Sequence, residues 1–146
     1  MKCLTLTETE MPEVATTNEV RLPTGLLGFE HLKDYLLVAK PGEEPFLWLQ
    51  VRDDGPLAFV VVNPFLIAPD YQPDIPQADV AFLGIEDPED AVLLNIVTLH
   101  SGGNATVNLK GPIVVNRHTM IGKQVVLANA SEYAVHHPLP LVEANA

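Results

Sequence analysis

The fold predicted from this sequence is built around residues 91–116, AVLLNIVTLHSGGNATVNLKGPIVVN. Ala91–Leu99 is almost continuously apolar and rich in β-branched residues, which is typical of a strand buried on both faces. The paired glycines of His100–Asn104 accept the positive φ angles that a tight reversal needs. Ala105–Leu109 then alternates small or polar residues with apolar ones, and Ile113–Asn116 is apolar again. We therefore predict two or three strands folded back on one another.

The short connections in this stretch indicate how its strands pair. Parallel neighbours need a crossover of about a dozen residues or more, and the links here are far shorter. The pairing is therefore predicted to be antiparallel. Pro112 cannot donate a ladder hydrogen bond, which predicts a bend or a sheet edge before the last strand.

Other short apolar runs along the chain are separated by turn residues. The runs predicted as strands are an opening edge strand around Leu4 and Leu6, Glu19–Leu22, Tyr35–Ala39, Phe46–Gln50, Leu57–Val62 and a last strand at Gln124–Ala128. Ile75–Leu83 is predicted as one short helix, with Pro76 in its first turn and Gly84 as its stop. About seven short strands joined by tight turns indicate a mainly β fold, either a small antiparallel β-barrel or a sandwich. Closure into a barrel is attractive because it removes exposed strand edges.

Length and composition indicate one globular domain. The chain has 146 residues, of which 47% are hydrophobic, and this is enough to bury a core without disulfides or metals. We expect residues 1–135 to form a single β-barrel domain. Residues 136–146, which include Pro138 and Pro140, are expected to be a loosely ordered tail.

The net charge and the cysteine content limit the kinds of partner and the cellular compartment that we expect for this protein. The formal net charge of −11 repels phosphate backbones, so we expect no direct contact with nucleic acid, whereas a basic protein partner would be favoured. Cys3 is the only cysteine, which excludes an intrachain disulfide and suits a reducing cytosol. The first residues lack the apolar core of a signal peptide, and no apolar run approaches the roughly 20 residues that span a bilayer. A cytoplasmic protein without membrane attachment is expected.

Two loops carry apolar residues in unusual settings. The segment Gly25–Glu30 holds two glycines but lacks the Lys-Ser/Thr of a phosphate-binding loop, so we interpret it as a turn that tucks Leu26, Leu27 and Phe29 into the core. The proline-interrupted loop Pro64–Tyr71 permits two interpretations. It could display Phe65, Ile67 and Tyr71 to a partner, or it could close one end of the barrel as a lid, which we favour because apolar residues in loops are usually packed.

No catalytic constellation stands out among the candidate residues. The five histidines show no helical pair at metalloprotease spacing, and the two serines, Ser101 and Ser131, lie outside a nucleophile elbow. The acidic pairs Asp53-Asp54 and Glu86-Asp87 fall on predicted turns exposed to water, whereas a catalytic acid/base pair of carboxylates needs burial to separate its two pKa values. These residues therefore give no reason to expect a metal site or a cofactor.

Several motifs in a fixed order resemble one known family. They are Gly25–Glu30, Phe46-Leu47-Trp48-Leu49-Gln50, Leu57–Val62 followed by Asn63-Pro64, Asp70-Tyr71, Leu83-Gly84-Ile85, Asn95–Leu99, Thr106–Asn116 and Gly122–Leu127. Together they cover roughly residues 20–133. Each motif is weak alone, but the ordered set is similar to the flagellar assembly factor FliW family.

The resemblance implies a small β-barrel without catalytic activity. Members of this family bind the translational regulator CsrA, relieve its repression of flagellin mRNA, and also bind flagellin in a partner-switching mechanism. We expect the Pro64–Tyr71 loop and the polar residues of the 95–116 stretch to form the contact surface. The candidate partner-binding residues are Phe65, Asp70, Tyr71, Asn108 and Asn116. The alternative is a small β-barrel enzyme or ligand-binding module with a pocket under the Pro64–Tyr71 loop; a barrel interior filled with side chains would favour the regulator.

Overall fold

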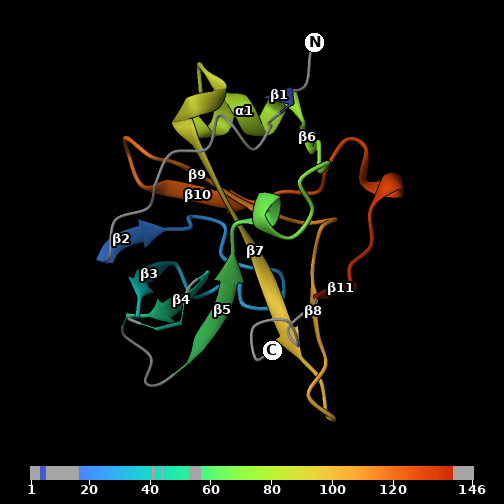
Figure 1. Ribbon diagram of the computed structural model, residues 1–146. Coiled ribbons are helices and arrows are strands. Elements are labelled where there is room, and N and C mark those ends of the chain that lie inside the picture. Colours follow the sequence, from blue (N-terminus) through green and yellow to red (C-terminus); the bar gives the residue numbers. More distant parts are fainter. Residues whose placement is uncertain (1–3, 6–16, 41, 44, 53–56, 140–146) are drawn as a thin grey trace.

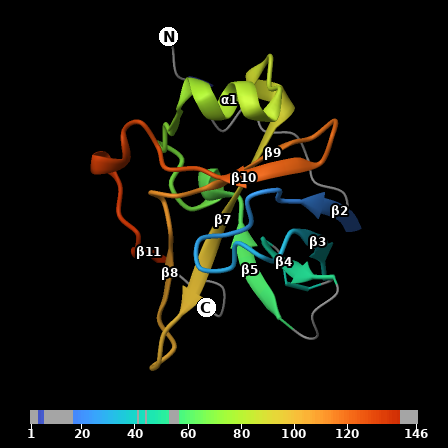
Figure 2. The ribbon, with the colours of Figure 1, turned by 180° about the vertical axis from the view of Figure 1, so that it is seen from behind.

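A computed structural model describes residues 4–5, 17–40, 42–43, 45–52 and 57–139. It shows a mainly β protein with one α-helix at one end of a barrel (Figures 1 and 2). Its strands are β1 (Leu4–Thr5), β2 (Thr17–Arg21), β3 (Asp34–Ala39), β4 (Phe46–Val51), β5 (Ala58–Val62), β6 (Asp74–Ile75), β7 (Ala91–Leu99), β8 (Ala105–Val107), β9 (Ile113–Asn116), β10 (Ile121–Gln124) and β11 (His137–Leu139). Its helices are η2 (Pro64–Leu66), α1 (Gln77–Leu83), η3 (Pro88–Asp90) and η4 (Ala130–Glu132), of which the three η elements are single 3-10 turns.

Seven of these strands close into a ring. The order is β7-β5-β4-β3-β2-β10-β9, and β9 pairs back onto β7. All pairings in the ring are antiparallel except that of β2 with β10, which is parallel and joins Arg21 to Ile121. The predicted small antiparallel barrel is confirmed, with this one parallel contact as its seam. Strands β8 and β11 extend the sheet beyond the ring along β7.

Strand β7 organises the barrel because it is long and buried on both faces. Its first four residues pair with β9, its middle pairs with β5, and its last three pair with β8. Val92 and Leu94 point into the barrel, whereas Ala91, Leu93 and Val97 belong to a second core on the outside. The nearly continuous apolar run of the sequence therefore reflects two cores that use alternate residues of one strand.

The barrel interior is filled by side chains. The buried residues of this inner core are Val20, Leu22, Leu26, Tyr35, Leu37, Leu49, Val51, Val61, Val92, Leu94, Ile113 and Val115. They come from six of the seven ring strands, all except β10, together with the turn after β2. The interior is therefore a packed core.

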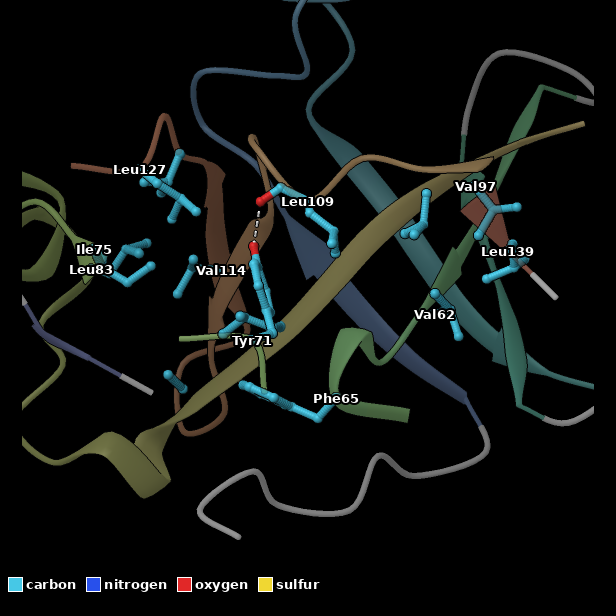
Figure 3. Close-up of a cluster of buried hydrophobic side chains, with 14 of the residues drawn as sticks. Val62, Phe65, Tyr71, Ile75, Leu83, Val97, Leu109, Val114, Leu127 and Leu139 are labelled. Atoms are coloured by element: carbon cyan, nitrogen blue, oxygen red, sulfur yellow. Dashed lines mark hydrogen bonds between the residues drawn. The ribbon is translucent and has the colours of Figure 1, made fainter. Parts of the chain in front are cut away.

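The outer core covers the other face of β7 and β9 (Figure 3). It is enclosed by the Pro64–Tyr71 loop, by β6 and α1, and by the chain that follows β10. Leu83 of α1 is 4% exposed and packs in this core, with Val80 partly buried against it. Gly84 ends the helix in the left-handed conformation at φ 68°, as the sequence predicts. No helix in the described ranges is long and apolar enough to cross a membrane.

Several boundaries differ from the sequence-based expectation. The helix begins at Gln77 because Pro76 serves as its N-cap and Asp74–Ile75 pair with β1. The last ring strand is β10 at Ile121–Gln124, ahead of the strand predicted at Gln124–Ala128, and residues 125–128 are not a strand. Gly122 allows this placement, since a Cβ there would lie 2.8 Å from Val115 Cγ2. The predicted turn with Asp53 and Asp54 lies outside the described residues, although β4 and β5 do pair antiparallel.

The C-terminal segment is also more ordered than expected. We assigned residues 136–146 to a loosely held tail, but His137–Leu139 form β11 and pair antiparallel with β8. Leu139 is 7% exposed and belongs to the outer core. The boundaries of the domain remain predictions.

Candidate partner-binding site

The Pro64–Tyr71 loop packs on the outer core through its aromatic rings. The Asn63 side chain accepts a hydrogen bond from the Phe65 N–H at 2.9 Å and so caps the 3-10 turn η2. Phe65 and Tyr71 are each 2% exposed, and their ring centroids lie 5.8 Å apart (Figure 3). The structure therefore favours the lid interpretation for these two residues, and Leu66, 58% exposed, points to solvent.

Tyr71 is held by a buried hydrogen-bond network. Its hydroxyl donates to the Leu109 carbonyl at 2.6 Å (Figure 3) and accepts from Asn95 Nδ2 at 3.5 Å. Asn95 Nδ2 also donates to the Asn108 carbonyl at 2.8 Å. Burial raises the pKa of the Tyr71 phenol, because the charged form loses its hydration. The hydroxyl therefore acts as a neutral anchor that ties the loop to the chain after β8.

Asn108 shapes the corner between β8 and β9. Its Oδ1 accepts hydrogen bonds from the N–H groups of Lys110 and Gly111 at 3.0 and 2.9 Å. These bonds replace ladder partners where the chain leaves β8 and turns toward β9. The Asn108 side chain is half-buried and also borders a surface hollow described below.

Asn116 links β9 to the end of the helix. It is 4% exposed, and its Nδ2 donates to the Leu83 and Gly84 carbonyls at 2.8 and 3.4 Å. Its Oδ1 accepts from the His118 N–H at 2.9 Å, which supports the turn into β10. Carbonyls at a helix end have no intrahelical partner, so Asn116 satisfies groups that would otherwise be buried unpaired.

The five candidate residues therefore do not form one exposed surface. Phe65, Tyr71 and Asn116 are buried, and Asn108 is half-buried. Tyr71 and Asn108 are joined through Asn95, and Phe65 stacks beside Tyr71, whereas Asn116 lies at the end of α1. Of the five side chains, only that of Asp70 is exposed.

Exposed apolar side chains gather at a different place. We expected Leu27 in the core with Leu26 and Phe29, but Leu27 is 84% exposed, whereas Leu26 is 1% exposed. Leu26 and Phe29 form an isolated bridge across the turn, which directs Leu26 inward and the neighbouring Leu27 outward. The expectation for Leu27 is wrong because a tight turn cannot bury both members of such a pair.

Leu27 stands between two surface hollows. One, of about 320 Å³, is bordered by the turn 24–27, Asn108–Gly111, Gln124–Val126 and Val135. The other, of about 390 Å³, lies between residues 58–60 of β5, residues 96–99 of β7 and the same turn. Leu26, Leu27 and Gln124 border both hollows. No sequence pattern marked this site, because its apolar residues come from separate segments.

Polar side chains in the described part of the chain form local pairs between neighbouring elements. Among the described residues, no group of three histidine, cysteine, aspartate or glutamate side chains could hold a metal ion. His118 Nε2 lies 2.8 Å from Asp90 Oδ1, and this hydrogen bond lowers the pKa of Asp90. Lys123 pairs with the largely buried Asp79 and so holds α1 against β10. These pairs join neighbouring elements, and Glu86-Asp87 lies exposed at a turn.

The fold and the surface together define a class: a small, side-chain-filled β-barrel with a second core on its outside and an exposed apolar surface. Residues 4–139 match the family described as FliW protein. The chain belongs to this family of flagellar assembly factors.

Individual relatives agree with this assignment. A flagellar assembly factor FliW from Syntrophus aciditrophicus is 40% identical over 121 residues, which cover 82% of this chain and 77% of the relative. One from Natranaerobius thermophilus is 39% identical over 129 residues, covering 87% and 85%. A crystal structure of the flagellar assembly factor FliW superposes with a TM-score of 0.74 at 33% identity, covering 87% of this chain and 89% of that one.

Proposed function

We propose that this protein is a non-catalytic regulator that binds CsrA, relieves repression of flagellin mRNA, and binds flagellin in a partner-switching mechanism in the cytoplasm. The observation that carries the proposal is membership of the FliW family along nearly the whole described chain. The family name describes an assembly factor, and assembly factors act on protein partners. The expectation of these particular partners comes from the resemblance of the ordered motifs.

Charge supports a basic protein partner. The net charge of −11 gives the surface a negative potential that attracts basic proteins and repels nucleic acid. Electrostatic attraction of this kind speeds association and weakens as salt screens it. We therefore expect the association rate with a basic partner to fall as the salt concentration rises.

The alternative, an enzyme or ligand-binding module, needs a cavity under the Pro64–Tyr71 loop. Phe65 and Tyr71 occupy the space below this loop together with the outer core. The inner core fills the barrel as well. Both observations favour the regulator, since a small-molecule site needs a concave space with convergent polar groups.

Calorimetric titration tests the proposal. The purified chain is titrated with CsrA of the same organism, and the titration is repeated with flagellin already bound. Micromolar or tighter binding of CsrA that flagellin abolishes is the expected result. Binding to neither protein would contradict the proposed function, whereas simultaneous binding of both would contradict partner switching alone.

The same titration tests the proposed contact residue Asp70, whose exposed carboxylate could meet a basic partner. We expect Asp70→Asn to weaken CsrA binding without changing the unfolding midpoint. The exposed Glu86 provides a control, because Glu86→Gln removes the same charge from a different turn. Equal effects of the two variants would indicate only a general charge contribution.

A further inference from the structure

Four exposed apolar side chains form what we call the Leu27 surface. They are Leu27, Leu99, Val126 and Val135, with exposed fractions of 84%, 68%, 73% and 44%. Each borders at least one of the two hollows, and Leu27 borders both. In Figure 2 the turn that carries Leu27 lies in front of β5 and β7. Exposed apolar side chains that gather in this way mark interaction sites in soluble proteins.

The turn that presents Leu27 outward is held by hydrogen bonds within its backbone and to the Gln124 side chain. The Leu27 N–H donates to Gln124 Oε1 at 2.9 Å, and Gln124 Nε2 donates to the Gly111 carbonyl at 3.3 Å. Within the turn, the Phe29 N–H donates to the Leu26 carbonyl at 2.7 Å. The backbone that carries the exposed leucine is therefore hydrogen-bonded to β10 and, through the Gln124 side chain, to the β8–β9 corner. A preorganised apolar group loses little entropy when a partner covers it.

We propose that the Leu27 surface docks a partner-protein segment that presents large apolar side chains next to basic ones. Outward-pointing side chains beside hollows suit interdigitation with another protein, whereas a small ligand would need to be enclosed. A second copy of this chain is disfavoured as the occupant because each copy carries a net charge of −11. The same charge favours basic residues in the partner.

Local chemistry agrees with a largely apolar contact. Glu30 and Lys110 are the charged residues that border the hollows, and both border the same one. The Glu30 carboxylate accepts a hydrogen bond from the Gly28 N–H at 3.1 Å, and this bond lowers its pKa. The rest of the border is mostly apolar. The inference rests on the proposed function in taking the occupant to be a protein, and it adds a second contact surface to the one proposed at Asp70.

Variants of exposed residues test the site without disturbing the core. We compare Leu27→Gln combined with Val126→Gln against Phe82→Gln, which alters an exposed apolar residue of α1 that borders neither hollow. Calorimetry with CsrA and with flagellin should show at least about a tenfold loss of affinity for one of them in the double variant. Phe82→Gln should leave both affinities within about twofold. Full affinity for both proteins in the double variant would overturn the proposal.

A second probe separates this inference from the proposed function. A designed amphipathic peptide of about 18 leucine and lysine residues is titrated into the labelled wild-type chain, with a leucine–glutamate peptide as control. Amide shifts should concentrate at Leu27, Gly111, Gln124 and Val126, and they should disappear in the double variant. If wild type bound neither CsrA nor flagellin, this result would sustain the docking site while the proposed function failed. Scattered shifts, or shifts that persist in the variant, would overturn the site.

Sedimentation velocity tests whether a second copy of this chain covers the Leu27 surface. The wild-type chain should remain monomeric as its concentration rises. A dimer that disappears with Leu27→Gln and Val126→Gln would identify a second copy as the occupant and would overturn the proposed partner chemistry.

Discussion

At the scale of single residues, the Tyr71 hydroxyl joins parts of the chain that are far apart in sequence. It donates to the Leu109 carbonyl across a separation of 38 residues and lies in a buried network with Asn95. A buried carbonyl without a donor costs more free energy than an ordinary hydrogen bond contributes. Asn108 and Asn116 similarly satisfy backbone groups where strands and the helix end. The polar side chains of these residues therefore stabilise the fold. A polar residue near a surface loop does not by itself indicate a contact with a partner.

Removing the Tyr71 hydroxyl should destabilise the protein. Tyr71→Phe leaves the Leu109 carbonyl without its donor and should lower the free energy of unfolding by about 1–3 kcal/mol, measured by urea denaturation. Tyr133→Phe is the matched control. Its half-exposed hydroxyl accepts a hydrogen bond from the Gln72 N–H, so a loss of about 0.5–1 kcal/mol is expected. Equal losses would contradict the anchoring role of Tyr71.

Stability should also fall in alkaline solution. Burial raises the pKa of the Tyr71 and Tyr35 phenols above the usual value of 10.0, so the unfolded chain ionises first as pH rises. Their contribution is fully present below pH 10 and is lost above it, by at most about 1.4 kcal/mol per pH unit for each tyrosine. Urea midpoints measured on both sides of pH 10 should show a smaller decline in Tyr71→Phe. An unchanged decline would assign the effect to other groups.

At the scale of elements, the turn between β2 and β3 presents Leu27 while burying Leu26. Its glycines have different tasks. Gly25 adopts φ 69°, and a Cβ there would lie 2.5 Å from Glu30 Cα, whereas Gly28 at φ 90° has open space around it. Only Gly25 therefore combines a left-handed conformation with a close backbone approach. The Leu27 surface depends on this packed reversal.

Alanine substitutions should separate these two tasks. Gly25→Ala adds backbone strain and a steric conflict, so it should cost about 2–4 kcal/mol in the free energy of unfolding. Gly28→Ala adds strain alone and should cost about 1–2 kcal/mol. Thermal and urea unfolding of both variants measure the difference. A larger loss for Gly28→Ala would show that the turn is not held as described.

At the scale of the whole molecule, one seven-stranded ring supports two cores. The inner core fills the barrel, and the outer core is covered by segments that lie before and after β7 in the sequence. Strand β11 completes the outer cover, because it pairs with β8 and brings Leu139 into that core. The C-terminal part of the described chain is therefore a structural component.

Shortening the chain tests this role. A chain ending at His136 loses β11 and the burial of Leu139, and it exposes the edge of β8. We expect the free energy of unfolding to fall by about 2–3 kcal/mol relative to a chain ending at Leu139. Hydrogen exchange at Ala105 and Val107 should accelerate in the shorter chain. Equal stability of the two chains would contradict a structural role for β11 and would indicate a loosely held tail.

The pattern along the chain predicted the barrel better than it predicted the site. The hydrophobic pattern and the turn residues are local properties of the chain. They were therefore enough to predict β7, the reversal after Leu99 and the end of α1 at Gly84. The last ring strand was misplaced because Gly122 and Lys123 carry no strand signal by themselves. The partners of Asn108 and Asn116 depend on corners and helix ends that form only in the folded chain.

The sequence by itself determined the mainly β class, the antiparallel meander around residues 91–116, the acidic surface and the family, because these depend on order, composition and local pattern. Only the tertiary structure decided which apolar residues are covered. Leu26 and Leu27 are adjacent and chemically identical, yet one is 1% and the other 84% exposed. The physical reason is that burial depends on neighbours supplied by distant strands. The turn can direct only one of the two side chains into the core.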